Sequence, residues 1–70
     1  MWYRVSVREE LIKNILDKVP RSMKRKYDVE RYANDYAYGL KLENVKPGDE
    51  DLVRSGKEYV YMRIEVDKKR

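Results

Sequence analysis

The densest group of chemically active side chains is a basic segment between residues 18 and 26. Five of its nine residues are cationic and none is acidic: Lys18, Arg21, Lys24, Arg25 and Lys26. Their combined charge exceeds the net charge of +4 that the whole chain of 70 residues carries. Clustered cations bind the phosphates of a nucleic acid and release its counterions. The segment is therefore a candidate nucleic-acid contact, although the pattern is also typical of a solvated helix face or of a dock for an acidic protein.

A second candidate site combines aromatic and arginine side chains from both ends of the chain. If residues 1–7 and 57–67 are strands, their alternation brings one set to an open sheet face: Trp2, Arg4, Tyr59, Tyr61 and Arg63. Rings stack on unpaired bases and guanidinium groups hold phosphates, so such a face is typical of single-stranded RNA or DNA binding. Two alternatives are equally open. Cross-strand aromatic pairs stabilise an exposed sheet without a ligand, and Trp, Tyr and Arg anchor protein interfaces.

The absence of two residue types restricts the catalytic chemistry. The chain has no cysteine and no histidine, so disulfides, thiol nucleophiles and Ser-His or Cys-His catalytic pairs are excluded. The sequence has no Gly-rich phosphate loop, and the acidic residues 49–51 lack EF-hand spacing and are interpreted as a solvated turn. We therefore expect no metal site and no cofactor, and any chemistry must come from Lys, Arg, Tyr or carboxylates.

The composition indicates one folded domain over residues 1–70. Hydrophobic residues make up 41% and charged residues 43% of the chain, and the many Lys, Glu and Arg residues with little Gly are thermophile-like. No apolar run approaches the ~20 residues that span a bilayer, and no signal peptide is recognised. We therefore expect a cytoplasmic protein without a membrane partner.

The hydrophobic pattern predicts three strands and two helices. Alternation predicts a strand over residues 1–7, and Ser6 with Glu9 predicts a capping box before a helix over 11–19 that Pro20 ends. Residues 28–38 fit either period. We favour a helix to Tyr38 with Gly39 as its stop, then a strand to Val45 and a turn at 47–49. Residues 51–56 would form one helical turn or a loop.

The last segment, residues 57–67, alternates most clearly and predicts a third strand. The order β-α-α-β-β predicts an α+β fold, a two-layer sandwich with both helices on one face of a small antiparallel sheet. The covered face of that sheet would carry Tyr3, Val5, Val7, Val60, Met62, Ile64 and Val66.

This element order on a small basic chain resembles the RelE/ParE-type toxins of toxin–antitoxin pairs. The resemblance rests on residues 2–7, on a first helix ended by Pro20, on a basic second helix followed by residues 40–43, and on residues 54–61. It implies an α+β fold and a surface that contacts RNA or an antitoxin and includes Arg54 and Lys41.

The sequence departs from the pattern of that family in three places. Val60 stands where the family carries an arginine, two residues separate Gly56 from Tyr59, and the chain ends at Arg70, before the family's final strand. These departures weigh against ribosome-dependent RNA cleavage and leave a contact surface for RNA or an antitoxin.

Three functions are compatible with these features. The leading hypothesis is a nucleic-acid-binding module that favours RNA over DNA, because an aromatic face suits unstacked bases. The second is a protein-interaction module, a homodimer or an adaptor, that uses the Trp/Tyr face. The third is a RelE-like RNase or its inactive relative, working through Lys, Arg and Tyr in place of histidine. We lean toward a protein that is not an enzyme.

Overall fold

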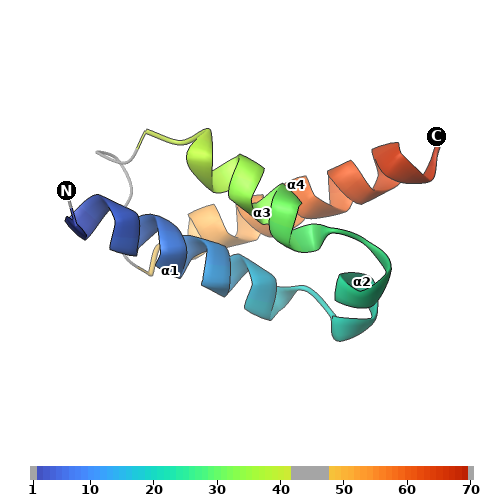
Figure 1. Cartoon of the computed structure of the whole chain (residues 1–70), viewed down its shortest axis with the longest axis horizontal. Helices are drawn as coiled ribbons and strands as arrows, with labels where there is room; N and C mark the ends of the chain where they lie inside the picture. Colours follow the sequence, from blue (N-terminus) through green and yellow to red (C-terminus); the bar gives the residue numbers. More distant parts are fainter. Residues whose placement is uncertain (1, 42–47, 70) are drawn as a thin grey trace.

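The part of the chain that the structure describes is entirely helical between its turns. The computed structural model describes residues 2–41 and 48–69, with side chains from Val7 onward. Its helices are α1 (Trp2–Lys18), α2 (Arg21–Lys26), α3 (Val29–Tyr38) and α4 (Glu50–Lys68). Helices α1, α3 and α4 pack against one another along the long axis, and the short α2 lies at one end (Figure 1). The predicted α+β sandwich is therefore wrong, because the described residues contain no strand.

The predicted strand over residues 57–67 is part of α4, because alternating apolar residues also satisfy a helix. In a helix, residues two apart point about 200° away from each other, whereas residues four apart share a face. Val60 and Ile64 are buried at 0% and 1% exposure, whereas Met62 and Val66 are 53% and 39% exposed. The apparent strand face thus consists of two helical pairs on opposite sides of α4.

The predicted strand over residues 1–7 and its capping box are also wrong. Helix α1 begins at Trp2, so Ser6 and Glu9 lie inside it rather than at its start. No glycine or proline interrupts the segment before Pro20, and a row spaced by four residues is buried in the core: Val7, Leu11, Ile15 and Val19. The helix ends at Lys18, one residue before the expected end, since Pro20 disfavours helical backbone in the residue before it.

Helix α3 confirms the helical interpretation of residues 28–38. The Oδ1 atom of Asp28 accepts a hydrogen bond from the backbone N–H of Arg31 at 3.3 Å and caps the first turn. The helix ends at Tyr38, and Gly39 is its C-cap. The strand expected after it does not begin at Leu40 or Lys41, and the rest of that predicted strand lies outside the described residues.

Helix α4 begins within the acidic run that was expected to be a solvated turn. Gly48 makes the turn with φ +77°, a backbone conformation that favours glycine. The Oδ1 atom of Asp49 then accepts hydrogen bonds from the backbone N–H groups of Asp51 at 3.0 Å and Leu52 at 3.2 Å. Negative charge in this first turn complements the positive end of the helix dipole. Residues 51–56 are therefore the start of a 19-residue helix rather than an isolated turn or a loop.

The core lies where α1, α3 and α4 meet. Ile15, Val60 and Ile64 are its largest fully buried side chains, and none of the described polar or charged residues is buried with them. Residues 20–26 contribute Met23, which packs partly buried against the core and holds α2 to the bundle. The rest of α2 is free to carry charge into solvent.

Candidate nucleic-acid interface

Helix α2 concentrates four of the predicted phosphate-binding residues on the surface. Its sequence places cations at nearly every position that does not face the core, and all of them are exposed: Arg21, Lys24, Arg25 and Lys26. The carbonyl of Pro20 accepts the backbone N–H groups of Met23 and Lys24, which starts the helix. No described carboxylate forms an ion pair with these cations. The ion pairs of the described residues lie within α4 and join Arg54 to Asp51 and Lys68 to Glu65. These four residues share one exposed helix, and their role as phosphate contacts stays a prediction.

The C-terminal turn of α4 brings further cations to the same end of the molecule. The Nζ atom of Lys68 lies 6.0 Å from the ring centroid of Tyr27, the residue that follows α2. That distance is the outer limit of a cation–π contact. Lys69 is exposed beside it, and Figure 1 shows α2 and the C-terminus at one end of the bundle. We call this cluster the basic end: Arg21, Lys24, Arg25, Lys26, Lys68 and Lys69.

Sequence reasoning did not include Lys68 and Lys69 in the site. Lys68 and Lys69 follow directly after the predicted strand over residues 57–67. That strand gave no reason to place them near the basic segment of residues 18–26. In the structure, α4 runs antiparallel to α3, so the last turn of α4 lies toward the end of the bundle where α3 begins (Figure 1). Because a helix rises only about 1.5 Å per residue, α4 is also much shorter than a strand of the same residues would be.

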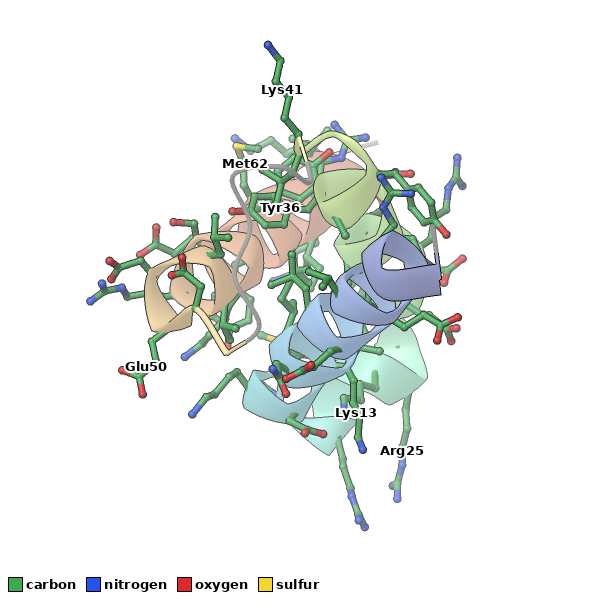
Figure 2. All side chains as sticks on the ribbon, turned by 90° about the vertical axis from the view of Figure 1, so that its left-hand side faces the viewer. Lys13, Arg25, Tyr36, Lys41, Glu50 and Met62 are labelled. Atoms are coloured by element: carbon green, nitrogen blue, oxygen red, sulfur yellow. The ribbon has the colours of Figure 1, made fainter. Side chains whose placement is uncertain are left out.

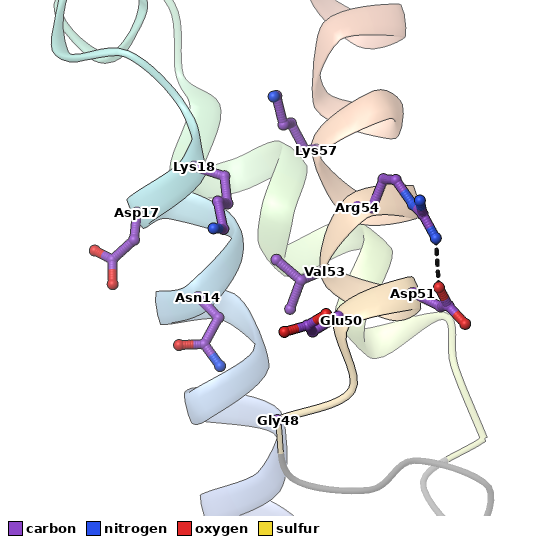
Figure 3. A pocket seen from close by; sticks show the side chains of 9 residues that line it. All are labelled: Asn14, Asp17, Lys18, Gly48, Glu50, Asp51, Val53, Arg54 and Lys57. Atoms are coloured by element: carbon purple, nitrogen blue, oxygen red, sulfur yellow. Dashed lines mark hydrogen bonds and ion pairs between the residues drawn. The ribbon is translucent and has the colours of Figure 1, made fainter.

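Lys18 belongs to a different surface from the α2 cations. It is the last residue of α1 and lines a groove of about 650 Å³ between α1 and α4 (Figure 3). The groove carries charges of both signs in equal number: Lys18, Arg54 and Lys57 against Asp17, Glu50 and Asp51. It therefore favours neither an anion nor a cation.

The predicted aromatic and arginine face does not exist among the described residues. Tyr59 and Tyr61 point to different sides of α4, because they are two residues apart in a helix. The ring of Tyr59 packs against that of Tyr36 with centroids 5.6 Å apart, whereas Tyr61 is partly buried against the core. Arg63 is half-buried, and its Nε atom has no hydrogen-bond partner there.

The N-terminal members of that predicted face are helical as well. The backbone of Trp2 and Arg4 lies in α1, so they cannot pair as a strand with residues 57–67. Their side chains lie outside the described residues.

The positions taken from the toxin resemblance do not join the basic end. Arg54 is exposed near the start of α4 and forms its ion pair with Asp51 one turn away. Lys41 is exposed beyond α3, and Figure 2 shows it on the side of the molecule opposite Arg25. The two residues therefore do not share a surface with α2.

Tyr36 is the described side chain whose acidity is clearly changed by the fold. Burial raises the pKa of Tyr36, the negative charge of Asp49 raises that pKa further, and a hydrogen bond with Ser55 lowers it. A tyrosine with a raised pKa is a weaker acid and stays protonated at neutral pH. No described group of three or more carboxylates could hold a metal ion. The candidate site is therefore the group of exposed cations on α2 and at the end of α4.

Comparisons with known proteins add no relative. No family model, no curated protein and no solved structure matches this chain. The resemblance to RelE/ParE-type toxins stays a prediction, and the α+β fold that it implied is wrong for the described residues. None of the helices in the described part is both long and apolar enough to cross a membrane.

Proposed function

We propose that this chain is a small cytoplasmic nucleic-acid-binding module that contacts the phosphate backbone through its basic end. The observation that carries the proposal is the group of exposed cations on α2, with Lys68 of α4 6.0 Å from the ring of Tyr27, the residue that follows α2. The α2 cations have no carboxylate of the described residues within ion-pair distance. Cations without intramolecular partners are available to an external polyanion.

The expected mode of binding is electrostatic and independent of base sequence. Each phosphate neutralised releases condensed counterions, so the affinity falls with salt in proportion to the number of contacts. The preference for RNA rested on an open sheet of aromatic residues, and the described residues contain no sheet. The remaining contacts recognise a phosphate backbone that RNA and DNA share, and both are therefore included in the experiment.

The test is fluorescence anisotropy with labelled single-stranded RNA, single-stranded DNA and duplex DNA at about 50 and about 200 mM salt, a range over which phosphate contacts lose affinity steeply. We expect binding at the lower salt concentration and a strong loss at the higher one. Replacing Lys24, Arg25 and Lys26 together by alanine should weaken binding to every sequence and reduce the salt slope by up to about 3.

The matched control removes the same three charges from elsewhere on the molecule. Lys13, Lys41 and Arg54 are all exposed and lie outside the basic end, so their joint replacement by alanine should retain most of the affinity. An equal loss in both triple variants would show a response to net charge alone. That result, or no binding of any probe at the lower salt concentration, would overturn the proposal.

A further inference from the structure

Helix α4 carries a second row of residues that the bundle leaves open only toward the C-terminus, because Leu52 and Tyr59 are partly covered within the bundle. The buried face of α4 consists of Val53, Gly56, Val60 and Ile64. Beside it, residues spaced alternately by three and four form a second row, which we call the outer row: Leu52, Ser55, Tyr59, Met62 and Val66. Met62 and Val66 are among the three exposed large hydrophobic residues of the described chain. Figure 2 shows Met62 on the side of the bundle opposite Lys13 and Arg25.

The spacing of the outer row is that of a helix that packs against another helix. An alternation of three and four residues is the a and d pattern of a heptad repeat, in which the two rows of a pair interlock. Tyr59 at the centre of the row packs against Tyr36 of α3, so α3 flanks the row and supports it. A second helix laid along the row would cover Met62 and Val66.

We propose that a second copy of this chain docks on the outer row, with the two α4 helices side by side and parallel. The argument for a second copy comes from the charges that border the row. When the row occupies positions a and d, Glu58 is at position g and Arg63 is at position e. In a parallel pair, position g faces position e five residues further along the other helix. Glu58 then lies opposite Arg63 of the partner subunit, and the twofold axis repeats the pair.

The same charges exclude the antiparallel arrangement. In an antiparallel pair, the g positions of the two helices face each other. All three g positions of α4 are acidic: Asp51, Glu58 and Glu65. An antiparallel pair would bring the acidic g positions of the two helices together, and the repulsion between like charges would destabilise it. The parallel orientation is therefore the one that the sequence of α4 supports.

Glu58 is open to an intermolecular contact, and Arg63 lies half-buried beside the row. Glu58 is exposed, and neither Glu58 nor Arg63 takes part in the ion pairs of the described residues. The Nε atom of Arg63 is buried without a hydrogen-bond partner in that part of the chain. Arginine is one of the residue types enriched among the anchors of protein interfaces.

The dimer is tested without nucleic acid, so its failure is separate from that of the proposed function. Sedimentation equilibrium from micromolar to millimolar protein should show a mass that rises from 8.5 kDa toward twice that value. Met62→Asp should abolish the rise, because it places a charge in the centre of the apolar contact. Tyr38→Asp is the matched control, since Tyr38 is 62% exposed and lies outside the row. A constant mass of 8.5 kDa across the range would overturn the proposal.

A charge exchange tests the predicted pair and its orientation. Glu58→Arg should weaken the dimer by placing two cations opposite each other, and the double variant Glu58→Arg with Arg63→Glu should restore it. Circular dichroism checks that each variant keeps its helix content. Failure of the double variant to restore the dimer while its helices remain folded would contradict the parallel register.

Cross-linking gives a second measurement of orientation. The chain has no cysteine, so Ser55→Cys introduces the only thiol. In the parallel dimer, the two copies of residue 55 face each other across the twofold axis, close enough for a disulfide. The control variant Ser22→Cys carries its thiol on α2, away from the row. Oxidation of Ser55→Cys that is no faster than that of Ser22→Cys would contradict the proposed arrangement.

Discussion

Gly56 of α4 lies directly against the side chain of Ile15 of α1. A Cβ atom added to Gly56 would lie 2.7 Å from Cγ1 of Ile15, closer still to its Cδ1, and 3.1 Å from Cδ2 of Tyr36. Ile15 is fully buried, and because protein cores are close-packed its side chain can shift only by displacing its neighbours. The three long helices therefore approach one another at a point where only a hydrogen atom fits.

Gly56→Ala is expected to destabilise the fold. Alanine favours a helix over glycine by about 1 kcal/mol, but forcing a methyl group into a packed core costs about 1–3 kcal/mol. The steric cost should prevail, because the contact is with a fully buried side chain. Chemical denaturation of the variant gives the measurement. The control is Gly39→Ala, where a Cβ would meet its nearest atoms at 3.4 and 3.5 Å and should leave stability nearly unchanged. Equal stability of the wild type and Gly56→Ala would contradict the helix packing.

Truncation of apolar residues on the buried and the exposed face of α4 should change the unfolding free energy by different amounts. Ile64→Ala removes a fully buried side chain and should cost about 2–5 kcal/mol of unfolding free energy. Met62→Ala removes a side chain that is 53% exposed and should cost less than about 1 kcal/mol. Both are measured by denaturant titration at low protein concentration. Similar losses in the two variants would indicate a strand, in which both residues share one face.

Asp49 should contribute to stability as the N-cap of α4. Asp49→Ala removes the acceptor of two backbone N–H groups and should cost about 1 kcal/mol. Asp49→Asn keeps an acceptor oxygen in the same place and should retain most of that free energy. Comparing the two variants therefore distinguishes the contribution of the hydrogen bonds from that of the negative charge. Thermal unfolding followed by circular dichroism gives both values. A loss as large in Asp49→Asn as in Asp49→Ala would show that the charge dominates.

Tyr36 should make the stability of the protein sensitive to alkaline pH. The fold raises the pKa of Tyr36 above its ordinary value of 10.0, mainly because burial disfavours the phenolate. The folded state therefore holds the proton more tightly than the unfolded chain. The stabilisation is fully present below pH 10 and is lost as the pH rises through the raised pKa of the folded state.

Tyr36→Phe isolates that contribution, because phenylalanine keeps the ring and cannot ionise. The unfolding free energy of the wild type should fall more steeply than that of the variant above about pH 10. Denaturant titrations of both proteins between pH 8 and about pH 11 give the comparison. Parallel pH dependence of the two would show that Tyr36 does not titrate differently in the folded state.

The sequence predicted the C-terminal ends of α1 and α3 more reliably than the type of the apolar segments. Pro20 and Gly48 act through their own backbone geometry, and Gly39 follows the last residue of α3, so each marks the end or the turn that was expected. The type of residues 57–67 was not determined locally. Val60, Met62, Ile64 and Val66 satisfy a period of two and also form two pairs with a spacing of four.

For the candidate site as well, the sequence identified residues that are close in the chain and failed for residues that are far apart. The cations of α2 lie within six residues of the chain, so the sequence alone identified them as one cluster. The aromatic and arginine face depended on residues far apart in sequence, and its prediction failed when the period of those segments proved to be 3.6.

The sequence by itself determined which side chains are available: a local cluster of lysine and arginine, no histidine and no cysteine, and the proline that ends the first helix. The tertiary structure decided which of those side chains meet. Val60 and Ile64 are buried, Met62 is exposed, and Lys68 lies beside Tyr27 because α1, α3 and α4 pack together. Burial between packed helices is shared by residues distant in the chain, and no short segment of sequence contains that information.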